Sequence, residues 1–429
     1  EEFYPEIAAN DAQREEWVRL CAIDEIKGDL TRTGYSNPLT VEFLKERPTL
    51  VVDTRNFDTT FVARLLEALG ELESRTDGIL VHSENFQALS LLQARYREQV
   101  DCVYIDPPYN SKTSEIAYKN TYKHSSWISL MENRLTLSRA LASEKAAHII
   151  AIDENEQEVL GQLLSAMFPT HEKICVVVVH NKKGIQGAYF SHSHEYAYFC
   201  IPPSLPETHG TPVPQSEWEY TNLRKWGRES ERSTARNCFY PIIVEEGSIV
   251  GFGDVCDDSF HPGSANVVCG NQVLVYPVDQ HGIERKWRYA RNRIESIQHL
   301  LKVHVTSQGE VQILKAVNEK PIKTVWDDSR YIAGDYGTKW LSNLGVKVKE
   351  DLYPKSVHVV EDSIFAVSDS KGMVLDYFGG SGTTAHAVIN LNRRVDSRRK
   401  FTVIEMGDYF DSILLPRIKK ITYSPEWKD

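Results

Sequence analysis

Through residues 78–201 the pattern of apolar and polar positions predicts strands that alternate with helices. The short apolar runs GILVHS and VDCVYID flank an amphipathic stretch whose apolar residues recur at helical spacing. The order returns near residue 371, where KGMVLD, a glycine-rich turn, a helical stretch and KFTVIE follow one another. Strands that alternate with helices favour a parallel sheet, and β-branched runs such as CVVVV fit a sheet covered on both faces. We therefore predict an α/β fold with a mainly parallel sheet.

The stretch between these two halves has a different pattern. It opens with the proline-rich IPPSLPETHGTPVP and has weak periodicity with many Gly, Pro, Ser and charged residues. Ahead of the first half, FDTTFVARLLEALGELES places apolar residues at helical spacing. The expected parts are an N-terminal helical segment at 1–78, a first α/β half at 79–201, an insert at 202–330 and a second α/β half at 331–429.

Composition narrows the class of protein. Of 429 residues, 41% are hydrophobic and 25% are charged, which is ordinary for a soluble globular protein. No apolar run reaches about 18 residues, so we expect no contact with a membrane. The acidic start EEFYPEIAAND has no apolar signal segment and no initiator methionine. We expect a cytoplasmic protein and a piece of a longer chain.

The cysteines and the net charge argue against a metal site and against a uniformly basic surface. The seven cysteines are scattered and form no CxxC pair, so they are read as reduced thiols, and no metal site is expected. The net charge of −11 argues against a uniformly basic surface for nucleic acid. If DNA is the partner, positive charge must be segregated onto one face.

The glycine-rich turn LDYFGGSGTTA follows a predicted strand and precedes a predicted helix. Gly380, Gly382 and Ala385 fit a GxGxxA spacing, in which glycines let a ligand approach the backbone and the helix start offers free N–H groups. Glu405 ends the next strand, where an acid can accept hydrogen bonds from ribose hydroxyls. Alone, the turn also fits a structural tight turn or the dinucleotide site of an oxidoreductase.

The stretch VYIDPPYN forms a second candidate site. Pro107 and Pro108 end the strand, so Asp106 is expected at its carboxyl end, the side on which α/β sheets bind ligands. The Asp106 carboxylate and the Pro107 carbonyl could accept hydrogen bonds from both N–H groups of an amino-substituted base, and Tyr109 could stack on it. The alternative is that Asp106 only caps the following turn, and we expect Asp153 to cap a helix.

DPPYN followed far downstream by LDYFGGSGTTAHAV resembles the amino-group DNA methyltransferases of the β order. More closely, the chain resembles the Mod (modification) subunits of type III restriction-modification systems, which methylate N6 of adenine from S-adenosylmethionine. Matching stretches, among them WISLMENRL, TVWDD, YPKS and RKFTVIEMGDYFD, cover about 79–200 and 324–425. The resemblance implies a Rossmann-like S-adenosylmethionine-dependent methyltransferase fold, acting on a base flipped out of duplex DNA.

The resemblance also implies roles for individual residues. The catalytic set is Asp106, Pro107, Pro108 and Tyr109. The cofactor set is Glu84, Lys355, Ser356, Asp376, Phe378, Gly380, Gly382, Thr383 and Glu405. Lys355 and Ser356 would close over the methionine end of the cofactor. Glu84 stands where the family usually has aspartate, and FGGSG where it more often has FAGSG. Asp rather than Ser at the start of the corner favours adenine over cytosine.

In the resembled family the insert is the target-recognition region. Here it holds two basic-aromatic clusters, LRKWGRESERSTAR and ERKWRYARNR, the second expected on a helix. The basic residues of such clusters are suited to contact DNA phosphates. The alternative is that they lie on an exposed helix and contact only solvent. The expected DNA-binding residues are Lys183, Arg224, Lys225, Arg228, Arg285, Lys286, Arg288 and Arg291. The implied partners are double-stranded DNA, a second copy of the chain, and a restriction endonuclease or defence-system subunit.

Two other readings of the methyltransferase motifs stay open. One is an N4-cytosine DNA methyltransferase, because the residue that begins the corner is an imperfect guide to the base. The other is a DNA-binding subunit whose methyltransferase centre is vestigial or depends on a partner.

Overall fold

The computed structural model divides the chain into two compact units. It describes residues 1–110, 124–187, 189–205, 208–227, 229–346, 352–394 and 397–425. One unit, called here the sheet unit, contains Glu1–His209 and Ile322–Asp429. The other, the inserted unit, contains Gly210–Pro321. The ends of the inserted unit thus lie inside the 202–330 expected from the sequence, and residues 1–78 belong to the sheet unit.

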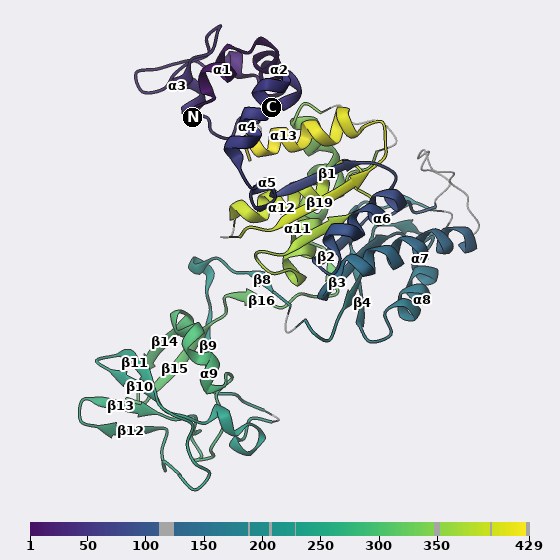
Figure 1. The fold of residues 1–429 in the computed structure, drawn as a ribbon. Helices are drawn as coiled ribbons and strands as arrows, with labels where there is room; N and C mark the ends of the chain where they lie inside the picture. The colour runs from purple at the N-terminus through teal and green to yellow at the C-terminus, as the bar shows by residue number, and fades with distance from the viewer. Residues whose placement is uncertain are drawn as a thin grey trace. The chain divides into compact units, whose positions relative to one another are not determined.

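A mainly parallel sheet forms the centre of the sheet unit, as predicted (Figure 1). In the described residues it has eight strands, and β7 alone runs antiparallel to its neighbours. Its strands in spatial order are β1 (Gly78–His82), β19 (Lys400–Glu405), β18 (Met373–Asp376), β2 (Val100–Ile105), β3 (Ala142–Ile152), β7 (Glu195–Ile201), β4 (Glu172–Val178) and β17 (Val325–Trp326). β18 therefore lies beside β2 although they come from opposite halves of the chain.

Helices cover both faces of this sheet, which explains the unbroken apolar strands. Along β2, Cys102 and Tyr104 belong to one buried cluster and Val103 and Ile105 to another, as the two-residue period of a strand requires. The first cluster includes residues of α11 (Val357–Val367) and α12 (Thr383–Arg394). The second includes residues of α6 (Asn85–Tyr96), α7 (His124–Leu141) and α8 (Gln157–Met167).

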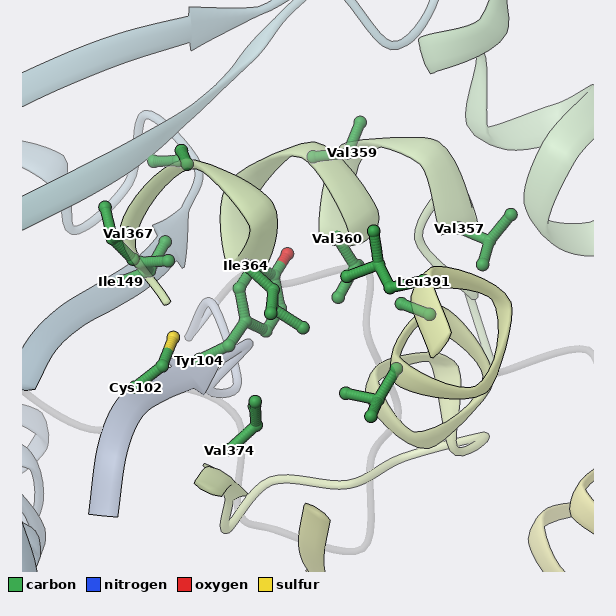
Figure 2. Packing of buried hydrophobic residues seen from close by; sticks show 14 of the residues in the cluster. Cys102, Tyr104, Ile149, Val357, Val359, Val360, Ile364, Val367, Val374 and Leu391 are labelled. Carbon is green, nitrogen blue, oxygen red and sulfur yellow. The ribbon is translucent and has the colours of Figure 1, made fainter. Parts of the chain in front are cut away.

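Helix α11 shows how the sequence produces this packing. Its sequence VHVVEDSIFAV puts apolar residues on most of its surface, and Ser356 caps its start by accepting a hydrogen bond from the His358 N–H. Val360 and Ile364 belong to the same buried cluster as Tyr104 of β2, and Figure 2 shows the three side chains in one region of the core. Ile364 is fully buried, so Ile364→Ala should cost about 2–5 kcal/mol of folding free energy.

The N-terminal segment is only partly helical. Its helices are α1 (Tyr4–Ala9), α2 (Asp11–Cys21), α3 (Val41–Lys45), α4 (Thr59–Leu69) and α5 (Leu72–Arg75). Between α2 and α4 the chain is mostly irregular, because glycines, prolines and charged residues interrupt the helical period there. The segment attaches to α13 (Leu415–Tyr423), whose Lys419 pairs with Glu16 at 2.6 Å and Asp53 at 2.5 Å.

The inserted unit is built from antiparallel strands. One sheet orders β11 (Ser248–Phe252), β10 (Ile242–Glu245), β13 (Gln272–Val275) and β12 (Asn266–Cys269), and another orders β14 (Leu301–Val305), β15 (Val311–Ala316) and β9 (Tyr220–Asn222). Over the whole described chain, none of the helices has the length and hydrophobicity to cross a membrane.

The second basic cluster is not on a helix, so that expectation was wrong. Arg285 and Trp287 form extended bridges with Glu231 and Arg224, and only Arg291–Ile294 is α-helical, as α9. Trp287 is buried and its indole N–H donates to the Tyr240 carbonyl at 2.8 Å. Burial of this tryptophan outweighs the weak local preference of a basic stretch for helix.

Candidate active site

Three acidic residues end three neighbouring strands. Asp106 follows β2, Asp376 ends β18 and Glu405 ends β19. These strands are parallel and hydrogen-bonded in that order, so their carboxyl ends lie at one edge of the sheet. The structure thus brings together the proline corner and the glycine turn that the sequence separates by most of its length.

The proline corner is held by a residue of α7 and by the side-chain amide of Asn110. The Pro108 carbonyl accepts a hydrogen bond from the buried Trp127 indole at 2.8 Å. Asn110 adopts a positive φ of 56° and its side chain donates to Glu156 at 2.7 Å. The Asp106 side chain keeps 28% of its surface exposed. A fixed backbone therefore presents an accessible carboxylate.

Lys355 lies at this corner, beside the proposed catalytic side chains. Its ammonium is 3.5 Å from the Asp106 carboxylate, donates to the Tyr109 hydroxyl, and lies 4.5 Å from the centre of the Tyr109 ring. The resemblance implied that Lys355 closes over the methionine end of the cofactor, and that role stays a prediction. The third partner, Glu195, lies 2.5 Å from the ammonium and was not predicted.

Glu195 reaches the site because β7 is antiparallel. As the first residue of β7, it lies at the edge where the parallel strands end. The sequence predicted this strand but gave no sign of its direction. The Tyr109 hydroxyl, 3.4 Å from the Glu195 carboxylate, completes the group of four side chains.

The charges of this group shift one another's pKa. Burial raises the pKa of Asp106, the Lys355 ammonium opposes that shift, and the Glu195 carboxylate adds to it. Burial lowers the pKa of Lys355, but the carboxylates of Asp106 and Glu195 raise it overall. Lys355 therefore stays protonated and favours an ionised Asp106.

Asp376 and Glu405 fix the glycine turn through its backbone. Asp376 accepts hydrogen bonds from the Phe378 N–H at 2.9 Å and the Thr384 hydroxyl at 2.5 Å. Glu405 accepts from the Gly380 N–H at 2.7 Å and from the next two N–H groups along its own strand end. Burial raises the pKa of Asp376 to about 7, with the carboxylates of Asp106 and Glu405 adding to the shift.

The two predicted glycines take conformations that other residues rarely adopt. Gly380 has a φ of +52° and Gly382 a φ of +83°. A Cβ on Gly382 would lie 3.1 Å from Leu414, whereas the nearest described atom to one on Gly380 is the Phe378 carbonyl oxygen at 3.9 Å. The backbone at Gly380 is therefore open to a ligand.

A buried arginine beneath the turn was missed by the sequence analysis. Arg417 of α13 donates to the Ser381 hydroxyl at 2.8 Å and the Thr383 hydroxyl at 3.0 Å, and its Nε faces His386 at 3.2 Å. Burial lowers the pKa of this guanidinium to about 9. Because the hydroxyl of Thr383 is bound to Arg417, Thr383 supports the turn from behind.

The remaining expected cofactor residues use their side chains mainly within the fold. Glu84 caps α6 through the Phe86 N–H at 2.8 Å and pairs with Arg134 at 2.8 Å. Ser356 caps α11 and donates to the Arg330 carbonyl at 2.7 Å. Phe378 lies half-buried in the turn. Asp153 does not cap α8 as expected, because it bonds the Asn155 N–H at 3.0 Å and the helix begins later.

The expected DNA-binding arginines of the inserted unit are largely occupied. Arg224 is buried, donates to the Val278 carbonyl and lies 4.6 Å above Trp226. Arg285 pairs with Asp279 at 2.8 Å, and Arg291 donates to the carbonyls of Gly253 and Phe252 at 2.6 and 2.9 Å. These contacts argue against the three as phosphate ligands.

The other expected DNA-binding residues differ in exposure. Lys225 and Lys286 are half-exposed and joined by a backbone hydrogen bond of 2.9 Å, and Arg288 is exposed. Lys183 is exposed in the sheet unit. Arg228 lies outside the described residues.

The chain is similar in sequence to known modification enzymes. It shares 25% identity over 390 residues with the type III EcoPI Mod subunit of Escherichia phage P1, covering 79% of this chain and 59% of that protein. It shares 26% over 366 residues with the type II methyltransferase M.KpnI of Klebsiella pneumoniae, covering 79% and 83%. It thus spans about three fifths of the EcoPI Mod subunit, or 59% of its length.

A solved structure and a family description also match. The M1.HpyAVI–SAM complex aligns over 81% of this chain and 99% of its own, with 12% identity and a TM-score of 0.36, values at which the match says nothing about the site. The family described as DNA methylase matches residues 100–414. Since that match covers most of the chain, including the proline corner and the glycine turn, the protein belongs to the DNA methylase family.

Proposed function

We propose that this chain transfers a methyl group from S-adenosylmethionine to the N6 amine of adenine in duplex DNA, as the modification component of a restriction or defence system. One observation carries the proposal. The proline corner and the glycine turn follow β2 and β18, which are adjacent and parallel, so both face one edge of the sheet. A base at Asp106 and a donor at Gly380 would meet there.

The residues at this edge suit a cationic cofactor. Four acids lie there: Asp106, Asp376, Glu195 and Glu405. The ammonium of Lys355 lies close to two of them, Asp106 and Glu195. The Tyr104 hydroxyl is buried near these carboxylates and has no hydrogen-bond partner among the described residues. S-adenosylmethionine would supply an electrophilic methyl group on a positively charged sulfur. A positive ligand would relieve the repulsion among these acids.

Each group at the corner has a separate task in this proposal. The N6 amine is a weak nucleophile because its lone pair is delocalised into the ring. Asp106 would accept a hydrogen bond from one N6–H and the Pro107 carbonyl from the other, which directs the lone pair toward the donor. Tyr109 would stack on the base. Lys355, held by Glu195, would keep Asp106 ionised, the form that accepts hydrogen bonds most strongly.

Glu405 would position the cofactor through the glycine turn. Its carboxylate already holds the Gly380 N–H at 2.7 Å, which fixes the open side of the turn. Its remaining lone pairs could accept from ribose hydroxyls. Asp376 and Arg417 would keep the turn in place from below.

Product analysis tests this function. The protein is incubated with unmethylated plasmid DNA and S-adenosylmethionine carrying a labelled methyl group, and the DNA is then digested to nucleosides. We expect label in N6-methyladenine. Label in N4-methylcytosine would contradict the choice of base. A protein that binds NAD but does not bind S-adenosylmethionine would contradict the choice of cofactor.

A further inference from the structure

A short hairpin carries the most exposed aromatic side chains among the described residues. It pairs β5 (Ile185–Gln186) with β6 (Ser191–His192), and Tyr189 and Phe190 near its tip are 92% and 84% exposed. Aromatic rings stabilise a fold by being buried, so fold stability gives no reason to expose two adjacent rings.

The hairpin is a built feature with two glycines at close approaches. Gly184 has a φ of +73°, and a Cβ there would lie 2.8 Å from the Ser191 Cβ. A Cβ on Gly187 would lie 2.5 Å from the Phe190 carbonyl oxygen, which accepts a hydrogen bond from the Gly187 N–H at 3.1 Å. Larger residues would force the two strands apart.

The base of the hairpin is anchored at the catalytic edge. Its second strand leads into β7, whose first residue is Glu195, the partner of Lys355. His192 pairs with Glu154 at 3.2 Å, and Glu154 lies just beyond the end of β3, the strand beside β2. The rings are therefore carried on an arm whose base adjoins Glu195, which shares the Lys355 ammonium with Asp106.

The sequence of the hairpin is suited to nucleic acid. Residues 181–194, NKKGIQGAYFSHSH, contain no Asp or Glu in a chain whose net charge is −11. Lys182 and Lys183 are exposed near its base. Lysines suit phosphates and exposed rings suit the faces of bases, so one arm offers both kinds of contact.

We infer that this hairpin enters duplex DNA beside the target base, and that Tyr189 and Phe190 fill the gap left in the base stack. The inference rests on the proposed function, because an amine inside the stack cannot reach the corner unless its base is extruded. Stacking of one base on an aromatic ring corresponds to about 5- to 150-fold in an equilibrium constant.

The test compares a variant without rings with one that keeps them. The double variant Tyr189→Ala/Phe190→Ala removes both rings, whereas Tyr189→Phe/Phe190→Tyr retains them. Leu91→Ala removes a 76% exposed apolar side chain from α6 as a surface control. The substrate is a duplex oligonucleotide carrying the site mapped by sequencing methylated plasmid DNA. Methylation is measured under single-turnover conditions on the duplex with adenine at the target position. Extrusion is measured separately, by the fluorescence of a second duplex that carries 2-aminopurine in place of the target adenine.

We expect the alanine variant to methylate the paired duplex at least about 10-fold more slowly, with a weaker 2-aminopurine signal. Its affinity for S-adenosylmethionine should stay within about two-fold. An abasic site opposite the target removes the base pair that must be broken, so it should restore most of the rate. The ring-retaining variant and Leu91→Ala should behave as the wild type.

Other outcomes separate the inference from the function on which it rests. Normal methylation of the paired duplex by the alanine variant would overturn the inference alone. So would a loss that the abasic substrate does not restore, or a change in oligomeric state, which would assign the hairpin to contact with a second copy. Absence of methyl transfer by the wild type would overturn the proposed function and the inference together.

Discussion

Buried charges are arranged differently at the carboxyl edge of the large sheet and inside the inserted unit. At the edge, acids crowd together, and burial and mutual repulsion raise the pKa of Asp376 to about 7. In the inserted unit, burial also opposes ionisation of Asp279, but bonds from the Ile283 N–H and Arg285 lower its pKa overall. The paired Asp279 serves the fold of the inserted unit, whereas crowded acids with raised pKa values are typical of functional sites.

The largest effect is expected at the proline corner. Asp106→Ala removes an acceptor that acts where charge develops, so methyl transfer to DNA should fall by at least about 100-fold, measured as kcat/KM. Binding of S-adenosylmethionine, measured by calorimetry, should change little. Asp153→Asn alters an acid at the end of the neighbouring strand β3 and is the matched control. Near-normal turnover by Asp106→Ala would refute the role assigned to this acid. The carboxyl edge of the sheet would then differ from the inserted unit in its charges but not in its function.

In the inserted unit the expected effect is on stability. Arg285→Ala leaves the fully buried Asp279 carboxylate without its cation, which should cost about 3–5 kcal/mol of unfolding free energy. Urea denaturation followed by tryptophan fluorescence measures it. Arg288→Ala, an exposed neighbour, should change stability by no more than about 0.5 kcal/mol. If Arg285→Ala left stability unchanged and weakened DNA binding, Arg285 would be a phosphate ligand and not a structural partner of Asp279.

The two half-exposed lysines of the inserted unit should contribute to DNA affinity instead. Lys225→Ala/Lys286→Ala removes two cations, so binding should weaken for all sequences and the slope of log K against log salt should fall by about 2. Fluorescence anisotropy at several salt concentrations measures both. An unchanged slope would show that these lysines meet no phosphate.

The smallest effects are opposite shifts in pH dependence. Ionised Asp106 accepts hydrogen bonds more strongly than its protonated form, so activity falls as pH drops through its raised pKa. Lys355→Met removes the cation that lowers this pKa, and the acid limb of the kcat/KM profile should move to higher pH. Glu195→Gln removes a carboxylate that raises it, and the limb should move to lower pH. Shifts in the same direction would contradict the assigned couplings.

The sequence was informative where one rule of topology applies. Parallel strands end at one edge, so locating Asp106 and the Gly380 turn at strand ends predicted that both lie at that edge, whereas their roles came from the family resemblance. That rule could not place Glu195, because the direction of β7 depends on its neighbours in the finished sheet. Arg417 comes from the last helix, where nothing in the local pattern distinguishes a buried cation from an exposed one.

The inserted unit was harder to predict for a related reason. Its short strands and turns give little periodicity, and two similar RKW tripeptides have different fates. Trp226 is 49% exposed, whereas Trp287 is 2% exposed in the core. Only packing against Tyr240 and its neighbours decides which tryptophan is buried, so local sequence could not separate structural arginines from exposed lysines.

A crystal structure of the chain with S-adenosylmethionine bound tests the central claim most directly. The account predicts that the ligand lies along the Gly380 turn with its ribose at Glu405, and that its methyl group is directed toward the Asp106 carboxylate. A ligand bound in another cavity, or with its methyl group turned away from Asp106, would contradict the claim that the two motifs form one site.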